Sequence, residues 1–337
     1  MPQRINWIDY AKVIGIYLVV LGHLPIPEQG SVYIYSFHMP LFFFISGFLS
    51  KTNNITFRQF ILKKIRTLII PYIIFSIGTY IFWVAIGRHF GSDADVVIPL
   101  YKPAIGILYG TTAHDYMIHN IPLWFIPCLF IVEMLWYGLH KLSIHIILLL
   151  CVCSIIGYIF PQLTSIRLPW GIEIAFTAIV FYGIGNIIQQ KNLLQIFHSN
   201  ITYITVIIIS ILVFIIGNKL QGRVDLNSLE FKNPILFYLT ACSGIFILHS
   251  ISKYKYIPNN SIISFISNHT LTILALHGLS ISVIKACMIF VFHIPIETIN
   301  NTIGLNSIVA LFAIIILIPC MIVFEKYMPI VIGKQKT

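Results

Sequence analysis

Residues 9–23 read Asp9-Tyr-Ala-Lys12-Val-Ile-Gly-Ile-Tyr-Leu-Val-Val-Leu-Gly-His23, an apolar stretch that carries one carboxylate, one ammonium and one imidazole. If the stretch is helical, the step from Lys12 to His23 makes about three turns, so both side chains project from one face. They would then lie about 16 Å apart along the helix axis. Asp9 precedes Lys12 by three residues and can pair with it on the same face.

A second apolar segment follows after a short connection and begins with Phe37-His38-Met39-Pro40. Two histidines, His23 and His38, therefore flank one tight connection between two apolar helices. Ionisable side chains in lipid are costly, which makes the pair a hypothesis for a functional site. The alternative is that each imidazole is a hydrogen-bonded polar group at a helix end. Imidazole titrates near neutral pH and suits removal of a proton from a hydroxyl.

The composition determines the class of protein. Hydrophobic residues make up 58% of the chain and charged residues only 9%, and the mean hydropathy is +0.91. Soluble domains carry about 25% charged residues, so we expect an all-α, polytopic membrane bundle. The net charge of +10 is dispersed between apolar segments, which excludes nucleic acid as the expected partner. The cysteines lie in apolar runs and predict neither a disulfide framework nor a metal site.

Ten segments have about the length needed to cross a membrane. With the N-terminus in the cytoplasm, basic residues in the connections favour the inner side, thirteen against six, which predicts that both termini are cytoplasmic. We expect residues 1–337 to form a single membrane domain with its core at about 5–325. The predicted spans run near residues 7–24, 32–50, 67–87, 121–139, 144–160, 170–188, 201–217, 234–251, 271–292 and 306–325.

The connection after the second span carries Lys63, Lys64 and Arg66. Three cations at the cytoplasmic mouth of a helix pair suit a phosphate-bearing ligand, and arginine adds a bidentate fork. The alternative is that these residues only orient the helix and contact anionic lipid head groups.

Four later residues are weaker candidates. Trp124 opens the fourth span, where tryptophan is ordinarily an interfacial belt residue. Glu133 and Glu173 lie within spans, so each is expected to have either a polar partner or a functional role. His277 is expected to face the interior in the inner half of the ninth span.

The chain resembles the acyltransferase 3 family of polytopic membrane O-acyltransferases, and within it the fucose 4-O-acetylase-like branch. The family's patterns are commonly written with arginine where this chain has Lys12 and Lys63, and lysine lacks the bidentate fork. The resemblance covers about residues 5 to 325. It rests on Asp9 with Lys12-x10-His23, on Phe37-His38-Met39-Pro40 with Ser46-Gly47, on Lys63-x-x-Arg66 before Pro71-Tyr72, on Pro122-Leu-Trp124-Phe, and on His277.

The resemblance implies transfer of an acyl group, most often acetyl, from cytoplasmic acyl-CoA to a sugar hydroxyl of a surface polysaccharide. The acceptor could be lipid-linked, and the membrane would be the bacterial inner membrane. Acetyl-CoA would be the donor substrate, with no metal. The implied catalytic residues are His23, His38, Asp9 and Lys12; the implied CoA-binding residues are Lys63, Lys64 and Arg66; the implied acceptor-binding residues are Trp124, Glu133, Glu173 and His277.

A secondary transporter or flippase is the alternative function, because ten helices with buried charges fit it as well. The sequence lacks the internal repeat and the matched broken helices that mark many transporters. A signalling or structural membrane protein is a third alternative, which leaves the two histidines without a role.

Overall fold

The computed structural model describes residues 5–51, 55–90, 97–195, 200–253, 260–295, 298 and 302–334. Within these ranges every regular element is a helix, and the one β-type pairing is an isolated bridge between Asp225 and Glu230. The predicted all-α class is therefore confirmed.

In the described ranges, nine helical stretches are long and apolar enough to cross a membrane. They correspond to nine of the ten predicted spans. The remaining one corresponds to α1 (Asn6–Gly22), whose 17 residues are close to the shortest length that spans a bilayer. The nine are Glu28–Leu49, Phe57–His89, Ile118–Leu139, Ile146–Leu163, Pro169–Gln190, Ile201–Gln221, Pro234–Ser252, Thr270–Phe290 and Ile303–Tyr327.

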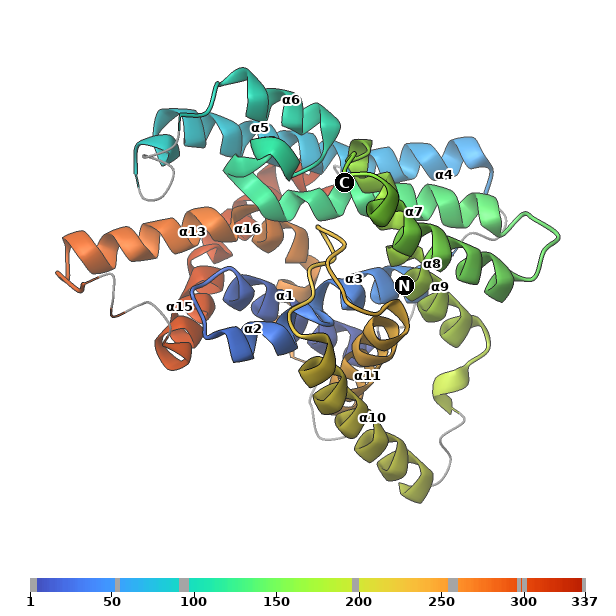
Figure 1. The fold of residues 1–337 in the computed structure, drawn as a ribbon. Helices are drawn as coiled ribbons and strands as arrows, with labels where there is room; N and C mark the ends of the chain where they lie inside the picture. The colour runs from blue at the N-terminus through green and yellow to red at the C-terminus, as the bar shows by residue number, and fades with distance from the viewer. Residues whose placement is uncertain are drawn as a thin grey trace. The chain divides into compact units, whose positions relative to one another are not determined.

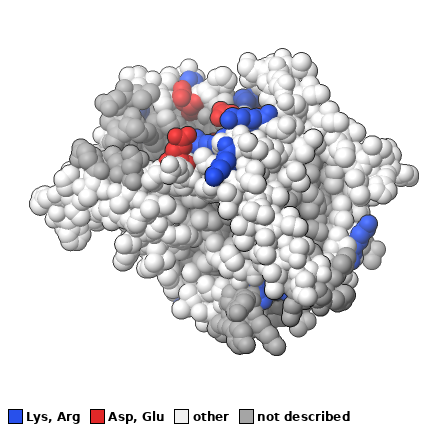
Figure 2. All heavy atoms as spheres, turned by 60° about the horizontal axis from the view of Figure 1, so that its bottom comes forward, with Lys and Arg blue, Asp and Glu red and all other residues white. Residues whose placement is uncertain are grey.

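The surface fits a lipid environment. On the face drawn in Figure 2, charged side chains gather in a few places and most of the surface is uncharged. Along α10 (Asn200–Gln221), Ile204, Ile208 and Leu212 recur at helical spacing and are each more than half exposed. Such an apolar row would be costly in water, so the protein is a multi-pass membrane protein.

The chain forms two compact units, each built from separated parts of the sequence. The first comprises Met1–Ser50, Val180–Ile273 and Leu279–Leu317, and the second comprises Lys51–Ile179, Leu274–Gly278 and Ile318–Thr337. Helices α9 (Ile172–Gln190) and α13 (Thr270–Phe290) contribute residues to both.

In the first unit, α10 and α11 lie side by side (Figure 1), and α1 contacts α3, α11, α12 and α15. Two glycines allow α3 and α9 to approach closely: a Cβ on Gly47 would overlap the Tyr182 carbonyl, and one on Gly185 would overlap the Phe44 carbonyl. Small residues commonly permit such crossings in membranes. The elements introduced here are α2 (Glu28–Tyr35), α3 (His38–Leu49), η7 (Leu193–Gln195), α11 (Pro234–Ser252), α12 (Ser261–Asn268) and α15 (Ile303–Ile316).

In the second unit, a π-helical turn, η1 (Ile65–Ile69), joins α4 (Phe57–Lys64) to α5 (Ile70–Ala85), and α4 lies along α7 (Phe125–Leu139) (Figure 1). Thr56 and Gln59 form a capping box that fixes the start of α4. The other elements are η2 (Gly87–His89), α6 (Tyr101–Tyr109), η4 (Ala113–Asp115), η5 (Ile118–Trp124), α8 (Ile146–Leu163), η6 (Pro169–Gly171), α16 (Ile318–Tyr327) and η8 (Pro329–Ile332).

Candidate functional site

His23 lies directly after the last residue of α1, and its side chain is exposed. Its Nδ1 is 2.8 Å from the carbonyl oxygen of Val19. A carbonyl oxygen can only accept a hydrogen bond, so Nδ1 carries the proton of the neutral ring. The lone pair is therefore on Nε2, which is the nitrogen able to accept a proton.

His38 is the first residue of α3 and is 3% exposed. Its Nδ1 is 2.8 Å from the Ile34 carbonyl oxygen, which fixes the same tautomer as in His23. The Tyr35 ring meets the His38 ring edge-on, with 5.0 Å between the ring centroids. The Tyr35 hydroxyl donates to the carbonyl oxygen of Gly22, next to His23, over 3.1 Å. Tyr35 thus links the two histidines.

Arg223 adds a positive charge to this group. Its guanidinium lies 4.3 Å from the centroid of the Tyr35 ring, and Nη2 is 4.0 Å from Oδ2 of Asp225. The segment that carries both charges is held in place because Val224 and Leu226 are buried. Asp225 also accepts a hydrogen bond from the backbone N–H of Asn227 over 2.9 Å, which forms an Asx turn.

We refer to His23, Tyr35, His38, Arg223 and Asp225 as the histidine site. The two imidazoles were predicted from the sequence, whereas Tyr35, Arg223 and Asp225 were not. The available signal was a pair of opposite charges two residues apart, directly after Gly222 in the connection between two spans.

Asp9 and Lys12 lie toward the other end of α1. The Asp9 Oδ1 accepts a hydrogen bond from the Ser267 hydroxyl, and the Lys12 ammonium donates to the Ser267 carbonyl oxygen, both over 2.6 Å. Ser267 is in the last turn of α12, where a cation is favoured by the helix dipole. Lys12 and His23 are about 16 Å apart along the axis, so the structure does not bring them together.

The predicted CoA-binding cations differ in their surroundings. The ammonium of Lys64 forms an ion pair with Oε2 of Glu133, whereas Lys63 is exposed at the end of α4. Arg66 lies in the π-helical turn, and its Nε is buried without a hydrogen-bond partner among the described residues. Unpartnered buried donors call for an explanation, and a bound anion would supply one. Lys63 and Arg66 are therefore the better placed of the three to meet a phosphate.

Both glutamates in the predicted acceptor site are buried and have partners. Glu133 is 3% exposed and pairs with Lys64. Glu173 is 2% exposed; its Oε1 is 3.0 Å from Nε of Arg167, and its Oε2 accepts from the Leu168 backbone N–H over 3.1 Å. The polar-partner alternative in the sequence analysis thus accounts for both carboxylates.

Trp124 and His277 are buried residues of the second unit. Trp124 is 6% exposed and packs edge-on against Phe125. His277 is 1% exposed, and its Nδ1 is 2.9 Å from the Leu274 carbonyl oxygen. Burial of Trp124 argues against a belt position at the lipid interface.

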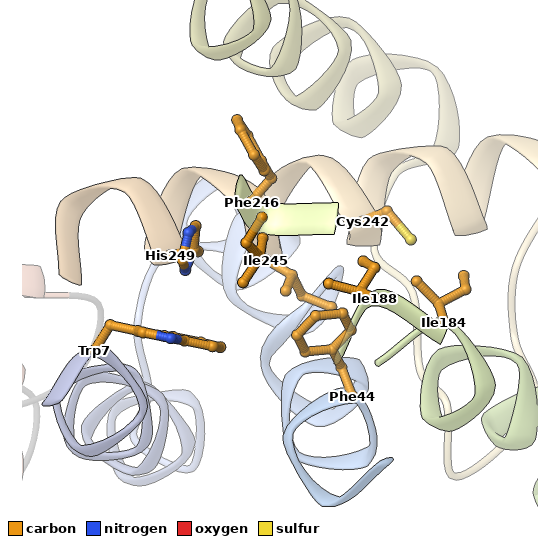
Figure 3. Close-up of a pocket in the computed structure, with 9 residues that line it drawn as sticks. Trp7, Phe44, Ile184, Ile188, Cys242, Ile245, Phe246 and His249 are labelled. Atoms are coloured by element: carbon orange, nitrogen blue, oxygen red, sulfur yellow. The ribbon is translucent and has the colours of Figure 1, made fainter. Parts of the chain in front are cut away.

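The first unit also contains an apolar cavity of about 210 Å³ near the start of α1. Figure 3 shows the rings of Trp7 and Phe44 and the side chain of Ile245 directed toward it, with His249 beside Trp7, whereas the ring of Phe246 points away. The remaining lining residues are Ile184, Ile188, Leu194, Cys242, Ile245 and Phe246. In the described part of the chain, no three histidine, cysteine or acidic residues cluster as a metal site would require.

Comparison with protein-family models finds that residues 5–325 match the acyltransferase 3 model, described as an acyltransferase domain. Comparison with curated proteins and with solved structures finds no match. The match covers both histidines, His23 and His38, and the basic residues of α4 and the π-helical turn.

Proposed function

Because this chain belongs to the acyltransferase 3 family and is a membrane acyltransferase, we propose that it transfers acetyl from cytoplasmic acetyl-CoA to a sugar hydroxyl of a surface polysaccharide. The acceptor would be polymeric or lipid-linked, in the bacterial plasma membrane. With the N-terminus in the cytoplasm, His23 faces the outer side, and Lys63 and Arg66 face the cytoplasm.

The observation that carries this proposal is the histidine site. An exposed imidazole with its tautomer fixed, next to a second imidazole and a guanidinium, is suited to deprotonating a hydroxyl. A neutral base that can reach solvent at the end of a span also meets the requirement that the acceptor sugar be accessible.

The proposed step is direct transfer. His23 Nε2 takes the proton of the acceptor hydroxyl as its oxygen attacks the thioester carbonyl carbon. A carbon–oxygen bond forms and the carbon–sulfur bond breaks. The CoA thiolate leaves and receives the proton from the imidazolium, so acetyl-CoA and alcohol yield ester and CoA. A positioned base of this kind is worth about 10²–10⁴ in rate.

The other members of the histidine site have supporting roles. His38 and Tyr35 hold the hydroxyl and the His23 ring in position. The Arg223 guanidinium stabilises the negative charge that develops on the thioester oxygen, which is often the largest contribution to such reactions. Asp9 and Lys12 position His23 from a distance. Their hydrogen bonds to Ser267 fix α1, and His23 directly follows the end of that helix.

At the cytoplasmic end, Lys63 and Arg66 would hold the phosphates of CoA. Lys63 and Arg66 belong to the α4–η1 segment. The ion pair of Lys64 with Glu133 holds this segment against α7. The acetyl group must then travel through the protein to reach the histidine site.

Replacing Arg66 with Gln should raise the KM for acetyl-CoA. A hydrogen bond to a charged group is worth about 1.5–3 kcal/mol, so the increase should be about tenfold to a hundredfold. The measurement is steady-state transfer of labelled acetyl at constant protein abundance. The matched control is Arg58→Gln, an exposed cation on α4, which should leave the KM unchanged. An unchanged KM in Arg66→Gln would assign Arg66 to membrane topology only.

The function is tested by incubating membranes that contain the protein with labelled acetyl-CoA and the host's surface glycan. The glycan is first treated with mild alkali to remove its ester groups. We expect alkali-labile label in the glycan. A transporter or a structural protein would leave the glycan unlabelled, and that result would contradict the proposal.

A further inference from the structure

The first unit has a polar groove of about 470 Å³ between α2 and the C-terminal end of α10. Ligand sites for small molecules commonly have volumes of about 300–1,000 Å³. The groove is lined by Glu28, Gln29, Val32, Tyr33, Asn218, Lys219 and Gly222. It thus combines a carboxylate, an ammonium, two amides and a phenol ring.

One residue of the groove, Asn218, has a side-chain oxygen without a hydrogen-bond partner in the described part of the chain. The side chain is 1% exposed, and its Nδ2 donates to the Phe214 carbonyl oxygen over 2.8 Å. That bond fixes the orientation of the amide, and Oδ1 is buried without a hydrogen-bond partner in the described part of the chain. A buried acceptor left unmatched is unfavourable, so Asn218 marks an unmet hydrogen-bonding demand in the wall of the groove.

The charges in the groove balance. Glu28 and Lys219 are exposed, and neither forms an ion pair with another described residue. One carboxylate and one ammonium give a net charge of zero, so the lining does not favour an ionic ligand of either sign. A carboxylate accepts from hydroxyls and an ammonium donates to them, so together they suit a ligand that carries several hydroxyl groups.

The groove and the histidine site use neighbouring residues of the chain on different sides of α2. Tyr33 and Val32 of α2 line the groove, whereas Tyr35, two residues on, points toward His38. Gly222 lines the groove and precedes Arg223, which stacks on Tyr35. Because Gly222 and Arg223 are consecutive, a ligand in the groove would lie beside the segment that carries Arg223 of the histidine site.

We propose that this groove binds a second, uncharged sugar residue of the acceptor, adjacent to the residue that is acylated. The acceptor is then an oligosaccharide or longer glycan, and a free monosaccharide fills only part of the site. This inference rests on the proposed function. The Tyr33 ring, held by Phe214 at 5.7 Å between centroids, offers a face for the apolar side of a pyranose.

The cavity beside Trp7 does not fit such a ligand. Its walls are aliphatic and aromatic side chains with one imidazole and one thiol, which could satisfy few of the hydroxyls of a sugar. Burying unmatched hydroxyls is costly. Of the two cavities, the groove is the one whose lining matches a glycan.

The test compares acceptors of different length. Alkali-treated surface glycan is partly hydrolysed with acid, and its monosaccharide and oligosaccharide fractions are assayed with labelled acetyl-CoA. We expect a lower KM for the oligosaccharides. In Asn218→Leu and Lys219→Gln, the oligosaccharide KM should rise about twofold to tenfold, the worth of one hydrogen bond. The KM values for the monosaccharide and for acetyl-CoA should not change.

Two of the variants make the result interpretable: Lys219→Gln and a control, Leu220→Ala. Lys219 is exposed, so Lys219→Gln tests the groove even if Asn218→Leu does not fold. Leu220→Ala, on the same helix and 61% exposed, should match the wild type. If the wild type transfers acetyl but has equal KM values for the monosaccharide and oligosaccharide fractions, the groove proposal is contradicted. It is also contradicted if Asn218→Leu and Lys219→Gln leave the oligosaccharide KM unchanged. Absence of transfer to every fraction by the wild type would contradict the proposed function.

Discussion

Replacing His23 with Ala should lower kcat for acetyl transfer by about 10²–10⁴-fold, the usual contribution of a positioned general base. The KM for acetyl-CoA should change little, because the cations assigned to CoA are Lys63 and Arg66. The measurement is initial-rate transfer of labelled acetyl at saturating donor and acceptor, with protein abundance checked by immunoblotting.

The matched control for this variant is His145→Ala. His145 is exposed and precedes α8 without capping it through its side chain, so its loss should leave kcat unchanged. Near-normal turnover in His23→Ala would remove His23 from the mechanism. A labelled acyl-enzyme that accumulates without acceptor would keep His23 important and would exclude direct transfer.

The second large effect concerns stability. Replacing Lys64 with Met leaves the buried carboxylate of Glu133 without its cation, because Glu133 is 3% exposed. Removing one partner of a buried ion pair typically costs about 3–5 kcal/mol. We therefore expect a clear loss of folded protein, measured by thermal unfolding of the detergent-solubilised protein.

The double variant Lys64→Met with Glu133→Gln tests the cause of that loss. With both charges removed, no isolated charge is left in the interior, so most of the stability should return. Lys63→Met, at the exposed neighbouring position, should unfold like the wild type. If the double variant were as unstable as Lys64→Met, the ion pair would not be the source of the effect.

The sequence predicted the spans well because backbone groups in lipid must be satisfied within helices, which gives long apolar runs. It also predicted that His23 and His38 lie near one another, since one short connection joins their helices. It placed the start of the second apolar segment at Phe37, directly before α3 begins, but did not predict that a separate helix, α2, precedes it with an interruption between the two. Pro40 has no N–H to donate to the carbonyl of residue 36, which accounts for the interruption.

The contacts between distant parts of the chain could not be predicted. Arg223 stacks on Tyr35 although almost two hundred residues separate them in the sequence. Lys64 pairs with Glu133 although they are about seventy residues apart. From the sequence, Lys64 and Glu133 were expected to bind different ligands, because charge and hydropathy patterns do not reveal which helices pack together. The sequence placed Lys12 on the same helix face as His23 but did not reveal that its ammonium donates to the Ser267 carbonyl oxygen at the end of α12.

The most direct test of the account is transfer across a sealed membrane. Inverted vesicles that contain the protein would enclose alkali-treated glycan and receive radiolabelled acetyl-CoA from outside. We predict labelled glycan inside the vesicles. In vesicles that carry His23→Ala, the label in the glycan should be lower by a factor of about one hundred or more. Unlabelled glycan in wild-type vesicles, or equal labelling with His23→Ala, would contradict the account.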